Sequence, residues 1–154
     1  MDTYLLLKTI HIISATLLFG TGLGSAYYMW SAHRSQNVHV IAHIASRVVI
    51  ADWLFTTPSI IIQPVTGFWM MSLNGIDLSS LWIMSSFILY IVAGLCWIPV
   101  VWIQIRVREL SKQMLASDTL PSDYYRYMKV WFSLGWPAFI SLIIIFFLMV
   151  LKPV

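Results

Sequence analysis

The chain has 154 residues, of which 60% are hydrophobic and only 10% are charged, and its formal net charge is +3. Soluble domains carry about 25% charged residues, so this composition excludes a soluble globular protein with a hydrated surface. The positive charge comes from basic residues gathered in a few connections, and it therefore does not indicate nucleic-acid binding.

Four stretches of the sequence contain no Asp, Glu, Lys or Arg: residues 9–33, 53–76, 78–105 and 130–151. Each of them reaches the roughly 20 residues that a helix needs to cross the hydrocarbon core of a bilayer. The chain is therefore predicted to be an all-α polytopic membrane protein, a single domain in which four transmembrane helices form an antiparallel bundle. The predicted spans are approximately residues 4–30, 45–71, 80–107 and 129–151.

The basic residues predict the orientation of these helices. Seven of the nine fall on one side of the arrangement: Arg34, Arg47, Arg106, Arg108, Lys112, Arg126 and Lys129. Only Lys8 and Lys152 lie near the chain ends. Because Lys and Arg concentrate in the cytoplasmic connections of membrane proteins, both termini are predicted to lie outside a bacterial cytoplasmic (inner) membrane. The polar connection from Glu109 to Tyr127 is then cytoplasmic.

The first predicted helix carries His11 near its start and the glycines Gly20, Gly22 and Gly24 at its middle. An imidazole at membrane depth needs a partner, which is either a group on a neighbouring helix or a bound metal. The Gly20–Gly24 spacing is a GxxxG pattern, which favours close helix packing over a face for a flat cofactor. The sequence does not decide which partner His11 has, and it does not decide whether the glycines serve helix packing or a cofactor.

The first connection contains His39 and His43 at the i, i+4 spacing of metal ligands on a helix. No third ligand lies in the same turn. A basic face in contact with anionic lipid headgroups is therefore the favoured interpretation of this segment.

The second predicted helix contains the least ordinary polar residues of the chain. Asp52 follows Arg47 by five residues, near enough in helical rotation for the long arginine side chain to reach the carboxylate. An acid in a membrane span is either paired in this way or part of a proton or ligand site. The pairing of Arg47 with Asp52 is the favoured prediction.

Prolines interrupt three of the predicted helices and predict kinks in the second, third and fourth: Pro58, Pro64, Pro99 and Pro137. Met84 lies near the start of the third helix, at about the depth predicted for His11. A methionine thioether at this depth is a candidate second axial ligand if a haem is bound to the histidine.

Several segments together resemble a known family. They are KTIHII with the glycine-rich half-helix after it, RVVIADWLFTTPSIIIQPVTG, YYRYMKVWFSLGWPAF and the closing LKP. Over nearly the whole chain they are similar to the HemJ-type protoporphyrinogen oxidases, and more closely similar to a bacterial family of predicted four-helix membrane proteins of unknown function. The first resemblance implies a multi-spanning protein that binds haem b and oxidises the last porphyrinogen before haem.

The resemblance to HemJ-type proteins covers six motif positions: His11, Arg47, Pro58, Gly67, Arg126 and the pair Lys152-Pro153. It implies His11 as a ligand of the haem iron and Arg47 as a partner of the propionates, while Gly20 and Gly24 would admit the porphyrin. Two features of the pattern are absent. No lysine stands in the segment 79–82, and Leu134-Gly135-Trp136 replaces an Asn-Glu pair.

Three functions follow as alternatives. The first is a haem-binding, redox-associated membrane protein with His11 as ligand, and the second is the HemJ-like oxidase itself. The third is a non-enzymatic membrane subunit or assembly factor whose GxxxG face binds partner helices. The expected partners are membrane lipids, and other membrane helices or a second copy of the chain. Whether the protein is an enzyme is left open.

Overall fold

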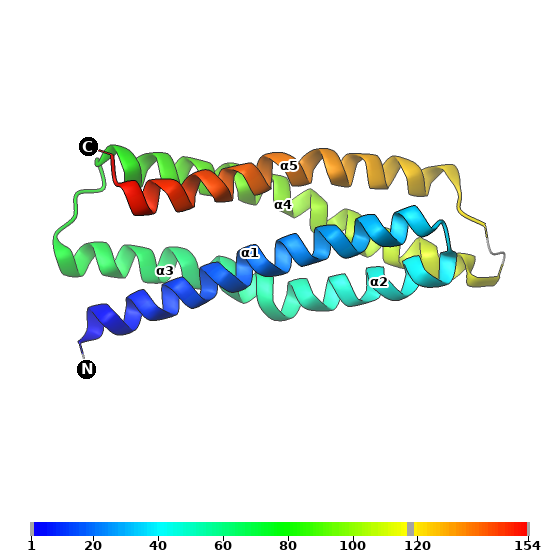
Figure 1. Cartoon of the computed structure of the whole chain (residues 1–154), viewed down its shortest axis with the longest axis horizontal. Helices are drawn as coiled ribbons and strands as arrows, with labels where there is room; N and C mark the ends of the chain where they lie inside the picture. The colour runs from blue at the N-terminus through cyan, green and yellow to red at the C-terminus, as the bar shows by residue number, and fades with distance from the viewer. Residues whose placement is uncertain (1, 117–118, 154) are drawn as a thin grey trace.

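The chain folds into four long rods of helix that run side by side, and this confirms the predicted all-α architecture (Figure 1). The computed structural model describes residues 2–116 and 119–153. Its elements are α1 (Thr3–Ser35), α2 (Val38–Ala51), the short π-helix η1 (Asp52–Thr56), α3 (Thr57–Asn74), α4 (Leu81–Gln113), the 3₁₀ turn η2 (Met114–Ala116) and α5 (Ser122–Leu151). The second rod is α2, η1 and α3 joined end to end.

The helices begin and end where capping chemistry favours it. The Asp2 carboxylate accepts a hydrogen bond from the backbone N–H of Tyr4 at 3.0 Å and caps α1. Gln36 takes the left-handed conformation, with φ 51°, and ends α1. Asn37 then accepts from the N–H groups of His39 and Val40 and starts α2. Gly75 ends α3 at φ 59°, a conformation that glycine adopts without strain.

The second rod departs from regular α-helix at η1. There the N–H of Thr57 donates to the carbonyl of Asp52, five residues earlier instead of four. Pro58 follows directly; it has no N–H for the carbonyl of Leu54, so the regular hydrogen-bond pattern cannot continue across this turn. The other helix prolines, Pro64, Pro99 and Pro137, lie inside helices that continue past them. The kinks expected at the prolines stay a prediction.

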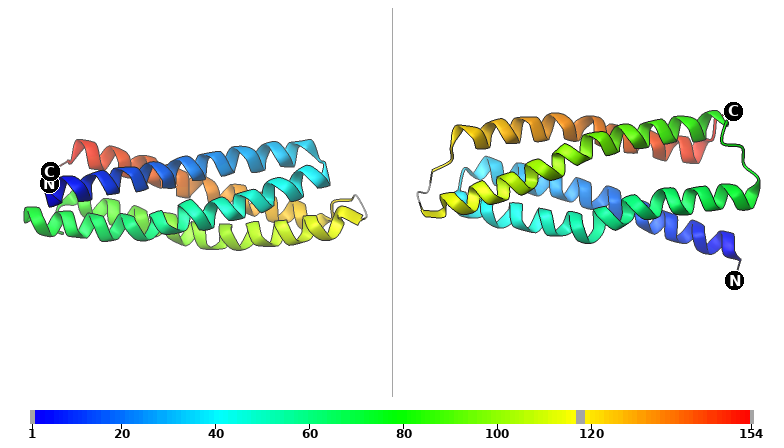
Figure 2. Two further views of the ribbon diagram at one scale, coloured as in Figure 1. Left: turned by 90° about the horizontal axis from the view of Figure 1, so that it is seen from below. Right: turned by 180° about the vertical axis from the view of Figure 1, so that it is seen from behind.

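The buried hydrophobic core lies toward the end where α1 turns into α2 and α4 is followed by α5; we call this the basic end. Apolar side chains of α1, α2, α4 and α5 form the core there: Met29, Ala32, Ile41, Ala45, Val48, Val100, Ile103, Val107, Tyr124, Met128 and Trp131. Both chain termini lie at the opposite end (Figures 1 and 2). Between the two ends α5 runs mainly along α4, and α1 crosses from α2 onto α3.

The outer faces of the bundle are apolar. Large side chains such as Leu95 and Phe147, which are 65% and 63% exposed, point away from the protein on all four rods. Side chains of this kind are stable when they face lipid tails, which are as apolar as they are. Each rod is long and apolar enough to cross a membrane. The protein is therefore a multi-pass integral membrane protein.

The helices extend beyond the predicted spans, mainly at the basic end. The stretch between the first two predicted spans is almost wholly helical, because only Gln36 and Asn37 separate α1 from α2. The expected polar loop from Glu109 to Tyr127 is shorter than predicted, since α4 runs to Gln113 and α5 begins at Ser122. Helices of 30 or more residues exceed the roughly 20 needed for the hydrocarbon core, so they project into the interfacial layer.

Candidate functional site

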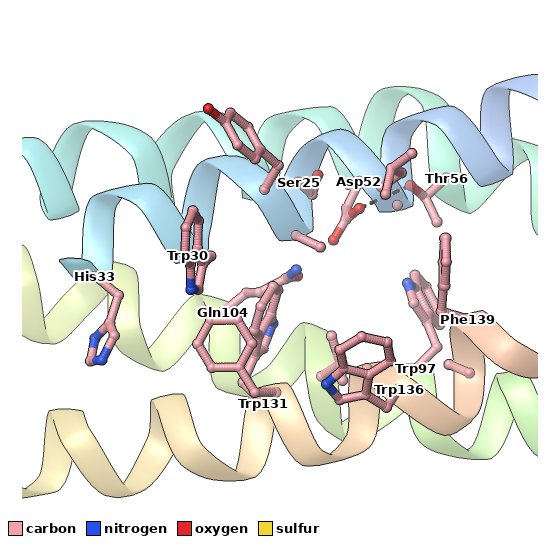
Figure 3. Close-up of a pocket in the computed structure, with 18 of the residues that line it drawn as sticks. Ser25, Trp30, His33, Asp52, Thr56, Trp97, Gln104, Trp131, Trp136 and Phe139 are labelled. Carbon is pink, nitrogen blue, oxygen red and sulfur yellow. Dashed lines mark hydrogen bonds between the residues drawn. The ribbon is translucent and has the colours of Figure 1, made fainter. Parts of the chain in front are cut away.

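A groove of about 940 Å³ lies among α1, α4 and α5 and reaches the π-helix η1 (Figure 3). It runs from the middle of the bundle, at Asp52 and Phe139, toward the basic end, at His33 and Arg34. Its wall is mostly aromatic and aliphatic, with a few polar groups. Pockets of 300–1,000 Å³ with such a lining are typical of small-molecule sites in proteins.

The deep polar part of this groove consists of Asp52, Thr56 and Gln104, which are 5%, 3% and 2% exposed. The Thr56 hydroxyl donates to Oδ1 of Asp52 at 2.9 Å. The side chain of Gln104, from α4, approaches the same carboxyl group (Figure 3). The π-helix therefore places Asp52 and Thr56 on the groove, and α4 supplies the third polar side chain.

Tryptophans of α4 and α5 face these polar groups across the groove. Trp97 is half-buried, Trp131 is 5% exposed, and Trp136 is exposed, so the wall extends from the interior to the lipid-facing surface. In the described part of the chain, two buried polar atoms of this region have no hydrogen-bond partner: Oε1 of Gln104 and Nε1 of Trp131. Such atoms are uncommon in folded proteins, because each loses its hydration without compensation.

The end of the groove nearest the basic end carries polar side chains that contact one another or a neighbouring ring. Nδ1 of His33 lies 3.1 Å from the hydroxyl of Tyr124, which is fully buried. The guanidinium of Arg34 lies 5.5 Å from the ring centroid of Trp30, a cation–π arrangement. Tyr125 donates to the side-chain oxygen of Gln36, which also lines this end.

The predicted pair of Arg47 with Asp52 does not form in this structure. Among the described residues the ion pair present is Arg106–Glu109, at 3.5 Å, and it is exposed. Arg47 lines a second, smaller groove of about 410 Å³ that also contains Gly24. The physical reason is helical rotation. At about 3.6 residues per turn, the five positions from Arg47 to Asp52 separate the two side chains by roughly 140° around the helix, and they line different grooves.

His11 lies between α1 and α3 as a packed and hydrogen-bonded histidine. Its Nδ1 is 2.8 Å from the hydroxyl oxygen of Thr66, and its Cε1 would lie 3.6 Å from a Cβ added to Gly67. The amide of Gln63 donates to the backbone oxygen of His11 at 2.7 Å and to the hydroxyl of Ser14. The interpretation of His11 as a histidine bound to a neighbouring helix therefore describes this geometry, and neither groove reaches it.

The glycines of α1 do not serve close helix packing within the chain. A Cβ added to Gly20, Gly22 or Gly24 would meet no atom within 4 Å. The packing expected from the GxxxG pattern is therefore wrong for the single chain. Gly22 opens onto the first groove and Gly24 onto the second, while Gly20 lies on the exposed surface.

Met84 is 49% exposed on α4 and lines neither groove, so the structure does not bring it to His11 in a shared pocket. His39 and His43 are exposed on α2. Among residues 2–116 and 119–153 no group of three His, Cys, Asp or Glu side chains is close enough to hold a metal ion.

Sequence reasoning missed the groove, although part of its lining carried a signal. Gln104 and Thr56 are polar residues in otherwise apolar spans, and the sequence predicts that an unpaired Asp52 belongs to a proton or ligand site. That these three side chains meet in one groove cannot be predicted from the sequence of each helix taken separately. Trp97, Trp131 and Trp136 carried no such signal, because tryptophans are common throughout this sequence.

Four lipid-facing rods around an internal aromatic groove define a polytopic α-helical membrane protein. The chain belongs to the DUF2269 family of predicted integral membrane proteins, whose family model matches residues 5–153. No curated protein and no solved structure matches the chain.

Proposed function

We propose that this protein binds an amphipathic small molecule within the membrane, in the groove among α1, α4 and α5. The observation that carries this proposal is the buried polar set of Asp52, Thr56 and Gln104 at the inner end of an aromatic groove of about 940 Å³. A polar group in a membrane span costs free energy unless it binds a ligand, an ion or a partner group. A groove with a few convergent polar groups is the usual form of a binding site.

Access from the bilayer supports the same function. The exposed Trp136 belongs to the groove lining, as does Gly22, whose missing side chain leaves open space on α1. A ligand dissolved in the lipid phase therefore reaches the groove sideways without first crossing an aqueous layer. This property fits a binding or carrier subunit for a lipid-soluble compound.

The proposal is tested with 11-bromoundecanol, a neutral amphiphile whose bromine quenches tryptophan fluorescence on contact. The protein is reconstituted into phosphatidylcholine nanodiscs, and quenching is followed against the mole fraction of the probe in the bilayer. We expect a saturable component from the groove on top of a non-saturable component from lipid-facing tryptophans. Gly22→Leu should weaken the saturable component about tenfold or more, because a leucine side chain fills part of the groove.

Gly20→Leu is the matched control, since it makes the same substitution on the same helix at an exposed position outside both grooves. It should leave the saturable component unchanged. Absence of saturable quenching in the unmodified protein would refute the proposal. Equal effects of the two substitutions would also refute it, because the groove would then not be the site.

A second candidate function, haem b binding through His11, is favoured by one specific observation. The Thr66 hydroxyl has a single hydrogen, and its 2.6 Å distance to the carbonyl of Ile62 assigns that hydrogen there. Nδ1 of His11 is then the donor to Thr66, and Nε2 keeps the lone pair that an iron ligand needs. The imidazole therefore has the chemistry of an iron ligand. Neither of the two grooves described reaches His11 to provide a cavity of porphyrin size there.

Absorption spectroscopy separates this candidate from the first. If haem is bound, protein expressed with ample haem shows a Soret band that His11→Ala abolishes or shifts and that His39→Ala leaves intact. A HemJ-like oxidase would in addition turn over porphyrinogen. A protein without Soret absorbance excludes both haem functions and leaves the groove proposal untouched.

A further inference from the structure

The Asp52 carboxyl group faces the groove without a cationic partner. It is 5% exposed, and among the described residues no Lys, Arg or His forms an ion pair with it. Arg47 belongs to the other groove, and Arg34 lies at the basic end over Trp30. Thr56 satisfies one position on Oδ1, and the side chain of Gln104 approaches the same carboxyl group. A carboxylate accepts about four hydrogen bonds, so the remaining acceptor positions are available to a ligand.

One further buried oxygen beside Asp52 also needs a hydrogen-bond donor, whereas Nε1 of Trp131 is itself a donor. Oε1 of Gln104 is a buried acceptor without a partner in the described part of the chain. Trp97 and Trp131 present aromatic rings across the groove. Aromatic faces attract cations, and an anion placed here would be repelled by Asp52.

We infer that the ligand of this groove is an amphiphile with one protonated amine, which Asp52 and Gln104 bind while its apolar body lies along the tryptophans. An ammonium group has three donors and no acceptor, which matches two oxygen acceptors and aromatic faces. The inference rests on the proposed function of the groove. Arg34 at the far end disfavours a second cationic group on the same ligand, so a monoamine is preferred over a diamine.

The test compares 11-bromoundecylamine with 11-bromoundecanol, two probes of equal chain length that differ in charge. Both are titrated in phosphatidylcholine nanodiscs at equal mole fraction in the bilayer, at a pH where the amine is protonated. We expect the amine to bind at least about tenfold more tightly than the alcohol. Asp52→Asn should reduce this preference to within about twofold.

Asp77→Asn is the matched control, because Asp77 lies in the exposed connection between α3 and α4, and its loss removes the same charge outside the groove. It should keep the tenfold preference. Equal affinity of the two probes for the unmodified protein would overturn the inference while the proposed function stands. A preference that survives Asp52→Asn would overturn it too. If neither probe shows saturable quenching, the proposed function itself fails.

The two probes are also compared on the unmodified protein, which needs no variant. This comparison tests the preference for an amine even if Asp52→Asn folds poorly. Gln104→Leu provides an independent check on the second acceptor. It should weaken binding of the amine several-fold, and an unchanged affinity for the amine would remove Gln104 from the inferred site.

Discussion

Nδ1 of His11 lies 2.8 Å from the hydroxyl oxygen of Thr66, and this hydrogen bond joins α1 to α3 across 55 positions of the sequence. Thr66 is itself 5% exposed and donates to the carbonyl of Ile62. Gln63, one turn away, donates to the backbone oxygen of His11. These polar contacts therefore hold the first and second rods together. Apolar contacts alone would specify this pairing poorly, because apolar side chains are equally stable against lipid tails.

Thr66→Val should destabilise the protein by about 1–2 kcal/mol. Valine has the same shape but cannot accept the hydrogen bond, so Nδ1 of His11 is left half-buried without that partner. The free energy of unfolding is measured by SDS titration in mixed micelles.

Thr16→Val is the control for this change. Thr16 makes the same type of bond to a carbonyl four residues earlier, at 2.9 Å, but is exposed on α1. Its substitution should change stability by less than about 0.5 kcal/mol. Equal losses for the two variants would show that the His11–Thr66 bond contributes no stability.

Gly67→Ala should be neutral or stabilise the protein by up to about 1 kcal/mol, because the added Cβ lies at an ordinary 3.6 Å from Cε1 of His11 and alanine favours helix. Gly67→Leu should instead displace the imidazole and cost about 1–3 kcal/mol. The same micelle titration measures both. Gly94, where an added Cβ meets no atom within 4 Å, is the control, and its two variants should differ little. A well-tolerated Gly67→Leu would contradict the packing of His11 on α3.

The separation of Arg47 from Asp52 predicts additive effects. Arg47→Ala and Asp52→Asn should change the free energy of unfolding independently, with the double variant within about 0.5 kcal/mol of the sum. A double-mutant cycle in detergent micelles measures this quantity. A coupling energy well above that value would mean that the two side chains form an ion pair in the membrane.

Both termini lie at the same end of the bundle, so they should lie on the same side of the membrane (Figure 1). The distribution of Lys and Arg further predicts that this side is outside. Phosphatase fused to the C-terminus should be active, and a fluorescent protein that folds only in the cytoplasm should be dark. The reverse result would invert the orientation and place Arg34 and Arg47 on the outer side.

Several features of the fold follow from the sequence because they depend on local chemistry and composition. Charge-free apolar stretches require lipid, and in lipid the backbone must satisfy its hydrogen bonds within a helix. The cap of α1 by Asp2 likewise depends only on residues next to each other in the sequence. Lengths were less well predicted, since residues 38–44 and 108–113 extend helices beyond the predicted spans.

The candidate site depended on relations that a linear sequence does not show. Spacing alone favoured Arg47 as the partner of Asp52, whereas the two side chains point to different sides of the helix and line different grooves. The GxxxG pattern favoured packing, but the open space beside Gly22 belongs to the groove. Both outcomes depend on which side of each helix faces its neighbours, and the packing of the whole bundle sets this.

The sequence by itself determined that this protein crosses a membrane as four helices, because solvation of side chains and backbone is decided residue by residue. Only the tertiary structure decided what the polar residues inside those helices do. It brought Gln104 of α4 to Asp52 and Thr56, joined His11 to Thr66, and left Arg47 apart from Asp52. The physical reason is that each polar group in a membrane must find its partner across helices, and which helices meet is set by the packing of the whole bundle.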